Sequence, residues 1–313
     1  MADKMATREA YGKTLVELGA ENPNLVVMDA DLSGSTKTGD FKKVYPERFF
    51  NAGIAEQNLY GMATGLALSG KTVCASTFAM FASGRAFEII RNSIGYAHAN
   101  VKVCATHAGI TVGEDGASHQ TFEDLALMRT IPGMTVVNPS DGNSAHELLK
   151  QVIAMEGPAY VRLGRAAVPQ FYTEETAKKI VLGKGNVLRE GKDLTVIATG
   201  IMVSEAMDAA NELENEGIDI RVIDIHTIKP LDKEIIIKAA LETGAIVTAE
   251  EHSVVGGLGA AVCEVTSCNA PVRVKMVGQN DTFGESGKPD ELKEKYGMTK
   301  NDIVKAVKEL IAK

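Results

Sequence analysis

Hydrophobic residues follow two rhythms along the chain, and the two rhythms alternate. Short runs rich in Val, Ile and Ala predict buried strands, because parallel strands covered on both faces are apolar at nearly every position. The stretches between these runs repeat apolar residues every three or four positions, which is typical of helices packed on a sheet. This alternation predicts an α/β protein built from two three-layer α/β domains with mainly parallel sheets.

The predicted elements fall into two groups. Strands are expected at 25–28, 72–76, 101–105, 194–198, 219–225, 245–249 and 272–276, and helices at 7–20, 56–68, 82–96 and twice within 290–313. Between 164 and 191 the periodicity fades, and Pro169 and several glycines occur there. We therefore expect one domain at 1–165, a linker at 166–191 and a second domain at 192–313.

Composition narrows the class of protein. Of the 313 residues, 45% are hydrophobic and 24% charged, as in an ordinary globular protein, and the net charge of −8 argues against binding to nucleic acid or an anionic membrane. No apolar run reaches the roughly 18 residues of a membrane span, and the first residues have no signal-peptide pattern. The four cysteines form no C-x-x-C pair, so we expect reduced thiols and a cytoplasmic location.

Two glycine-rich stretches match nucleotide-binding patterns only on the surface. Residues 65–72 (GLALSGKT) fit the P-loop pattern, but a P-loop needs a strand before it and a helix after it, and here the predicted order is reversed. Gly70 is therefore predicted to end a helix. The stretch 256–259 (GGLG) lacks the dinucleotide-binding spacing, so close packing at a helix start is the favoured explanation.

Three segments place polar or aromatic side chains where parallel sheets bind ligands, at the ends of strands. Glu56 opens a helix and would ordinarily be a partner of the helix dipole, but in a pocket of small residues it could share a proton with a ligand nitrogen. Phe78 and Phe81 follow a strand and would either fill the core or form one wall for a flat heterocycle.

The third segment is the glycine-rich loop at 106–120, which contains two histidines and two carboxylates. The spacing of twelve between His107 and His119 matches no common zinc pattern, so we expect no metal site and instead hydrogen bonding or proton transfer to a polar substrate. Arg8, Arg162 and Arg165 could bind a terminal phosphate, although each alone is more often part of an ion pair.

Several motifs, in this order, resemble those of transketolase: PERFFNA followed by GIAEQN at 46–58, STFAMF at 76–81 and GEDGASHQ at 113–120. The resemblance covers essentially the whole chain, as a pyrimidine-binding domain followed by a transketolase C-terminal domain. It implies the C-terminal half of a split, two-gene transketolase, an enzyme that uses thiamine diphosphate to move a two-carbon ketol unit from a ketose phosphate to an aldose phosphate in the pentose phosphate pathway.

The family holds the cofactor's diphosphate through a divalent metal such as Mg²⁺, with a G-D-G motif followed by an Asn, and this chain has no G-D-G. The resemblance therefore implies an N-terminal partner subunit that carries the diphosphate-binding domain and the metal. A two-plus-two heterotetramer is the expected assembly, with the thiamine diphosphate shared between the two kinds of chain.

The resemblance also assigns roles to residues of the first domain. Glu56 resembles the carboxylate that bonds a ring nitrogen of the cofactor's aminopyrimidine, so that the neighbouring amine can remove the thiazolium proton. Phe78 and Phe81 resemble aromatics that stack on the pyrimidine, while Gly84 stands where a third ring, usually Tyr, is found. Asp31 resembles a residue near the cofactor interface.

Substrate roles are implied for the loop and for the arginines. His107, Asp115 and His119 resemble residues that bind sugar hydroxyls, and the two histidines would also assist proton transfer. The expected phosphate clamp consists of Arg8, Ser35 and Arg165. The second domain resembles one that supplies dimer contacts and no catalysis, so His226 and His252 are expected to be structural.

Three other functions remain open from the sequence. Deoxyxylulose-phosphate synthase shares the Glu and the D-G-x-[ST]-H-Q run, but usually reads G-A-D-G where this chain has GEDG at 113–116. The β subunit of 2-oxoacid dehydrogenases has this length and domain order but generally lacks the loop. A non-catalytic, transketolase-like assembly partner is the third alternative.

Overall fold

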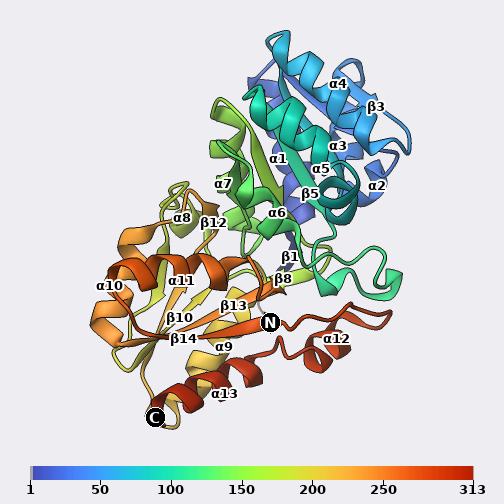
Figure 1. Ribbon diagram of the computed structural model, residues 1–313. Helices are drawn as coiled ribbons and strands as arrows, with labels where there is room; N and C mark the ends of the chain where they lie inside the picture. Colours follow the sequence, from blue (N-terminus) through green and yellow to red (C-terminus); the bar gives the residue numbers. More distant parts are fainter. Residues whose placement is uncertain (1–2, 313) are drawn as a thin grey trace.

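The computed structural model describes residues 3–312 and has two α/β halves, one blue to green and the other yellow to red (Figure 1). A seven-stranded sheet forms the first half, in the order β12-β6-β7-β5-β4-β2-β3. Its strands are β2 (Leu25–Asp29), β3 (Phe49–Asn51), β4 (Thr72–Phe78), β5 (Val101–Thr106), β6 (Thr135–Val137), β7 (Ala159–Arg162) and β12 (Thr227–Lys229). All neighbours are parallel except β12 and β6.

The second half is built on a five-stranded sheet in the order β14-β13-β10-β11-β9. Its strands are β9 (Asn186–Arg189), β10 (Leu194–Ala198), β11 (Ile220–Asp224), β13 (Ala245–Ser253) and β14 (Arg273–Gln279). Only β9 runs antiparallel to its neighbour. The predicted fold class, two mainly parallel α/β sheets with helices, is confirmed.

Helices cover both sheets (Figure 1). They are α1 (Thr7–Glu21), α2 (Ser33–Thr36), α3 (Thr38–Val44), α4 (Glu56–Leu68), α5 (Phe87–Ile89), α6 (Asp124–Thr130), α7 (Gly142–Ala154), α8 (Glu174–Ala177), α9 (Met202–Glu214), α10 (Lys233–Thr243), α11 (Leu258–Asn269), α12 (Pro289–Lys295) and α13 (Lys300–Ile311). In the first half α1 packs on α7 and α3, and in the second half α9 packs on α13 and α10 on α11. The helix expected at 82–96 is instead a short α-helix, α5, between two π-helical turns, Phe81–Arg85 and Ile90–Tyr96.

The segment predicted as a linker has structure of its own. Within 166–191, β8 (Ala167–Pro169) pairs antiparallel with β1 (Lys4–Ala6), α8 follows, and β9 joins the second sheet. Each of these elements has only three or four residues, too few to show a period in the sequence. The strand β12 crosses in the other direction and joins the first sheet, so the two halves are interleaved at their junction.

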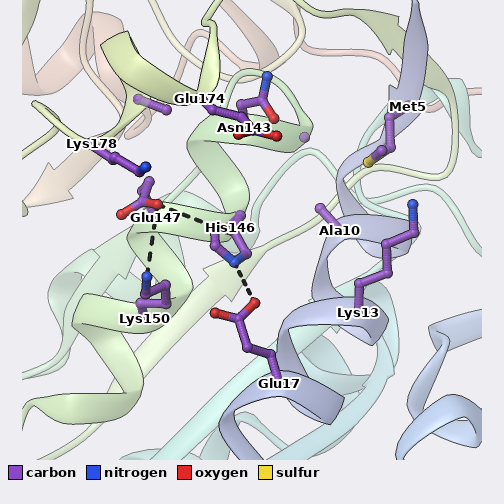
Figure 2. A pocket seen from close by; sticks show the side chains of 12 residues that line it. Met5, Ala10, Lys13, Glu17, Asn143, His146, Glu147, Lys150, Glu174 and Lys178 are labelled. Atoms are coloured by element: carbon purple, nitrogen blue, oxygen red, sulfur yellow. Dashed lines mark hydrogen bonds and ion pairs between the residues drawn. The ribbon is translucent and has the colours of Figure 1, made fainter.

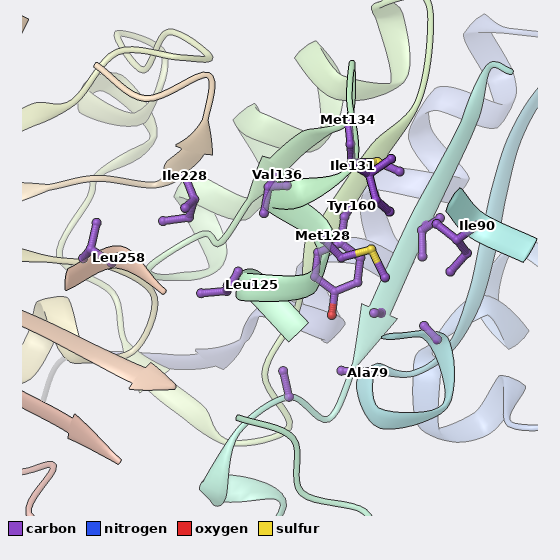
Figure 3. Close-up of a cluster of buried hydrophobic side chains, with 14 of the residues drawn as sticks. Ala79, Ile90, Leu125, Met128, Ile131, Met134, Val136, Tyr160, Ile228 and Leu258 are labelled. Carbon is purple, nitrogen blue, oxygen red and sulfur yellow. The ribbon is translucent and has the colours of Figure 1, made fainter. Parts of the chain in front are cut away.

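One hydrophobic cluster continues from the first half into the second (Figure 3). Leu125 and Met128 on α6 belong to it together with Val136 on β6, Ile228 on β12 and Leu258 on α11. All five side chains are almost fully buried. Because burial of apolar surface is the main stabilising contribution in folding, this shared cluster joins the two halves across their junction.

The structure confirms both interpretations of the glycine-rich stretches. Residues 65–72 run from the end of α4 into β4, with Gly70 at φ 88° and its N–H donated to the carbonyl of Ala67. At the start of α11, the Glu250 carboxylate accepts the N–H groups of Leu258 at 2.7 Å and Gly259 at 2.8 Å. The anion that such a helix start favours is thus supplied by the protein itself.

Candidate active site

The turn after β2 is built around a buried carboxylate, Asp29. Its Oδ1 accepts the N–H of Leu32 at 2.5 Å, and its Oδ2 accepts the hydroxyls of Thr36 at 2.6 Å and Thr38 at 2.9 Å. Burial raises the pKa of Asp29 although these donors oppose the shift. Asp29 therefore shapes the 30–38 turn that carries Asp31, and the sequence analysis missed it.

Asp31 lies in the left-handed region at φ 65°, which is uncommon for a residue other than glycine. Its backbone N–H donates to Asn51 Oδ1 at 3.0 Å, and its Oδ1 accepts from Asn51 Nδ2 at 2.8 Å. Asn51 ends β3 and its Oδ1 also accepts the N–H of Gly53. The two strand ends are thereby tied together at one edge of the sheet, next to the start of α4.

Glu56 is the first residue of α4 and is only 4% exposed. Its Oε2 has no hydrogen-bond partner, and the nearest cation, Nε of the exposed Arg85, is 4.0 Å away. A helix-dipole partner is normally solvated, so the dipole alone does not explain this burial. A buried carboxylate oxygen without a donor costs free energy, and it fits a ligand that brings a donor to it.

A cluster of rings lies beyond the ends of β4 and β5. Phe78 and Phe81 stack with centroids 5.9 Å apart and an interplanar angle of 13°. Phe78 also stacks on His107 at 3.9 Å, while His119 stands edge-on to Phe81 at 5.3 Å. A Cβ added to Gly84 would meet the methyl of Met80, so this methionine occupies the space beside the ring pair where the resemblance places a third ring.

His107 occupies a left-handed turn at φ 58° at the end of β5 and is 3% exposed. Burial lowers the pKa of His107 to about 3, and the nearby charges of Arg8 and Arg165 act in the same direction. The ring is therefore neutral at physiological pH. Its Nε2 lies 3.4 Å from Nη1 of Arg8, which can only donate, so Nε2 accepts and Nδ1–H faces the Thr106 hydroxyl at 2.9 Å.

The expected phosphate-binding residues lie around the same histidine. Arg8 Nη1 donates to the carbonyl of Ser35 at 2.7 Å. Arg165 donates to the carbonyl of Val112 and pairs with Glu114 Oε2 at 3.1 Å. Glu114 was missed by the sequence analysis, which had only its neighbour Asp115 to follow from the resemblance.

The structure separates the other candidates. Asp115 is exposed at the end of the 3₁₀ turn Ile110–Asp115, and His119 faces the Ser118 hydroxyl at 3.0 Å through Nδ1. Arg162 is wrong as a phosphate ligand, because it is buried and donates to Asp124 at 2.8 Å and to the Glu251 carbonyl at 2.8 Å. Its ion pairs are satisfied inside the protein, and they join the two halves.

Of the two histidines expected to be structural, His252 is fully buried and contacts the Ser253 carbonyl at 2.7 Å. His226 is also fully buried, with Nδ1 2.9 Å from the Thr227 hydroxyl, and burial lowers its pKa to about 4. Within residues 3–312, no group of three or more His, Cys, Asp or Glu side chains is placed to hold a metal ion. The described helices include none that is both long and apolar enough to cross a membrane.

A separate hollow of about 460 Å³ lies on the far side of α1, between α1, α7 and α8 (Figure 2). His146 lies there between two carboxylates, with Nε2 2.8 Å from Glu17 and Nδ1 3.2 Å from Glu147. None of the predicted site residues lines this hollow. Its ion pairs tie α1 to α7 rather than contribute to the site at the strand ends.

Sequence comparison decides the family. The family model "Transketolase, pyrimidine binding domain" matches residues 3–170, and "Transketolase, C-terminal domain" matches residues 183–303. The chain belongs to the transketolase family. It is the C-terminal half of a split transketolase, with the two domains in the order that the motifs predicted.

Relatives of similar length support this assignment. A putative transketolase C-terminal section from Methanocaldococcus jannaschii is 51% identical over 307 residues, which cover 98% of this chain and 96% of that protein. One subunit of the apulose-4-phosphate transketolase of Phocaeicola vulgatus is 42% identical over 314 residues, and each chain is fully covered. By contrast, this chain spans 50% of a human transketolase to which it is 38% identical.

A solved structure has the same fold over nearly its whole length. It is described as a split gene transketolase, inactive beta4 tetramer, and is 56% identical with a TM-score of 0.92. The match covers 98% of this chain and 99% of that one. A transketolase from Leishmania mexicana, with a TM-score of 0.84 and 25% identity, is matched over 46% of its chain.

Proposed function

We propose that the protein is a subunit of a thiamine-diphosphate-dependent transketolase that transfers a two-carbon ketol unit from a ketose phosphate to an aldose phosphate. The observation that carries the proposal is the buried Oε2 of Glu56, which has no partner, at the same sheet edge as the ring pair of Phe78 and Phe81. Membership of the family and its pyrimidine-binding domain support the same cofactor.

These residues fit the aminopyrimidine end of the cofactor. Protonated Glu56 would donate to a ring nitrogen, and a carboxylate suits this role because it can hold or release the proton. Phe78 and Phe81 would pack against the flat ring, and Asp31 would lie near the cofactor interface. Thiamine diphosphate, when bound, supplies the nucleophilic carbon that carries the two-carbon unit.

The substrate would lie against His107, Asp115 and His119 with its phosphate end at Arg8, Ser35 and Arg165. Neutral His107 offers Nε2 as an acceptor for a sugar hydroxyl, in the place where it now meets Arg8. His107 and His119 would move protons during transfer. Family members act on different sugars, since one relative is named for apulose 4-phosphate, so the preferred donor has to be measured.

An N-terminal partner subunit would hold the diphosphate and a divalent metal such as Mg²⁺. This proposal is supported by the missing G-D-G motif, by the half-length match to the human enzyme and by the name "C-terminal section" of a relative. We propose a two-plus-two heterotetramer.

The test is to assay ketol transfer from xylulose 5-phosphate with this chain alone, with the partner alone and with both. We expect activity only from the pair, and weak binding of thiamine diphosphate to the isolated chain by calorimetry, because the diphosphate has no ligands there. Micromolar affinity of the isolated chain, or transfer without the partner, would overturn the partner dependence. A pair that binds the cofactor but transfers no unit from any ketose phosphate would favour the non-catalytic alternative.

A further inference from the structure

The second half of the chain reaches into the loop that carries the two site histidines. Glu251 lies on β13 and is 3% exposed, and its Oε1 accepts the backbone N–H of Thr111 at 2.7 Å. Its Oε2 lies 3.7 Å from Nη1 of Arg162, at the end of β7. One buried carboxylate therefore joins the 3₁₀ turn of the loop to the edge of the first sheet.

The loop backbone is adapted to this contact. Gly109 has φ 79°, and a Cβ added there would overlap the carboxyl group of Glu251. Any other residue at 109 would displace the carboxylate as well as strain the backbone. The loop thus passes directly against the second half only two residues after His107.

The other end of the loop is held by the segment just before α12. Gln120 Nε2 donates to the carbonyl of Glu285 at 2.9 Å, and to the carbonyls of Ile110 and Gly113 within the loop at 3.3 Å each. A Cβ at Gly113 would lie 3.2 Å from the ring of Pro289, the first residue of α12. The second half therefore encloses the loop from both ends, before and after the turn that leads to His119.

We propose that Glu251 is a positioning residue for ketol transfer: through the Thr111 backbone it fixes the loop that sets His107 and His119 against the substrate. The second half then contributes to the geometry of the site as well as to assembly. This inference rests on the proposed function, because the histidines are assigned to the substrate there. It does not require Glu251 to touch the substrate or the cofactor.

The neighbouring residue provides a matched control. Glu250 is on the same strand and is equally buried, but its carboxylate holds the start of α11 through Leu258 and Gly259 and is not bonded to the loop. Shortening either carboxylate by one methylene removes a buried hydrogen bond of similar length. Only the change at position 251 releases the Thr111 N–H.

The experiment measures kcat and KM of the two-subunit enzyme with Glu251→Asp, Glu251→Gln and Glu250→Asp. We expect Glu251→Asp to lower kcat roughly 10- to 100-fold with phosphorylated and unphosphorylated donors alike, since a displacement of about 1 Å in a reacting group has an effect of this size. KM should change little. Glu251→Gln keeps an oxygen that can accept the Thr111 N–H, so it should retain most of kcat although it loses its charge beside Arg162.

A second measurement does not depend on activity. In the isolated chain, NMR signals of the His107 and His119 rings should shift in Glu251→Asp and stay in place in Glu250→Asp, although both variants lose thermal stability. If Glu251→Asp matches Glu250→Asp in kcat and leaves both ring signals unchanged, the inference is overturned. If the wild-type pair shows no ketol transfer, the proposed function fails, and the ring signals still decide whether Glu251 positions the loop.

Discussion

At the scale of single residues, Glu56 is the group whose environment calls for a ligand. Glu56→Gln keeps the size of the side chain but cannot share a proton, so we expect the partner complex to form normally while proton exchange at the thiazolium carbon slows by at least an order of magnitude. Exchange is followed by NMR of the bound cofactor. The control is Glu47→Gln, an exposed carboxylate paired with Arg48. A wild-type exchange rate in Glu56→Gln would leave Glu56 as a helix-terminus carboxylate.

Arg165 and His107 should respond in opposite ways to removal. A charged contact to phosphate contributes about 1.5–3 kcal/mol and acts far from the reacting carbons, so Arg165→Ala should raise KM for phosphorylated donors roughly 10- to 100-fold with little change in kcat. Non-phosphorylated hydroxypyruvate should be much less affected.

His107→Ala should instead lower kcat with both donors, because the ring would lie where charge develops. Steady-state kinetics with the two donors distinguishes the roles. An equal loss of kcat with both donors in Arg165→Ala would refute the phosphate clamp. Because Arg165 is already paired with Glu114, the phosphate would have to share or replace that carboxylate.

Residues that follow one another in a motif could be found from the sequence, and residues that act across the fold could not. Glu56, Phe78 and His107 each stand at the end of a strand or the start of a helix, where the residue type itself is informative. Glu251 contacts a residue 140 positions away, and nothing local distinguishes it from Glu250. Arg162 was overestimated for the same reason, since its partners Asp124 and Glu251 are distant in sequence.

At the scale of elements, the long periodic helices and the apolar strands were predicted close to their observed bounds. Elements of three or four residues, such as β1, β8 and β12, were missed, because pairing with a distant strand rather than local pattern determines them. The π turns on either side of α5 also follow no local rule that we could apply, because their residues have an ordinary helical pattern.

The end of α4 provides a prediction about local stability. Gly70 has φ 88°, and no atom lies within 4 Å of a Cβ added there, so Gly70→Ala should cost about 1 kcal/mol of unfolding free energy through backbone strain alone. Gly61, in the middle of the same helix, has equally open space and a helical backbone, so Gly61→Ala should stabilise by about 0.5–1 kcal/mol. Urea unfolding of the isolated chain measures both. Changes of the same sign would show that Gly70 is not required by its conformation.

At the scale of the whole molecule, the junction between the halves is polar as well as apolar. The shared hydrophobic cluster lies beside buried charges: Arg162 with Asp124 and Glu251, and a second group around Asp224. Removing one member of such a group leaves its partner buried and uncompensated, which destabilises more than the net contribution of the pair. The same junction holds the histidine loop, so domain docking and site geometry are properties of one interface.

Asp224, at the end of β11, makes that junction sensitive to pH. Its Oδ2 accepts the hydroxyls of Ser140 from the first half at 2.7 Å and Tyr172 from the connecting segment at 3.0 Å, while its Oδ1 is buried without a partner. Burial raises the pKa of Asp224 to about 7, and the nearby Asp141 carboxylate adds to the shift. Between pH of about 4 and 7 the folded protein therefore holds a proton that the unfolded chain has released.

This difference in pKa has a defined sign. The stability that comes from protonated Asp224 is present below pH of about 4 and is lost as the pH rises through about 7. Asp224→Asn removes the titration, so its unfolding free energy should gain on that of the wild type by a total of about a few kcal/mol between pH 4 and 8, at roughly 1.4 kcal/mol per pKa unit. Ser140→Ala, which removes one donor and keeps the carboxyl group, should be less stable than the wild type and retain the pH dependence. Denaturant unfolding at several pH values measures this, and a constant difference between Asp224→Asn and the wild type would show that the carboxyl group does not titrate in this range.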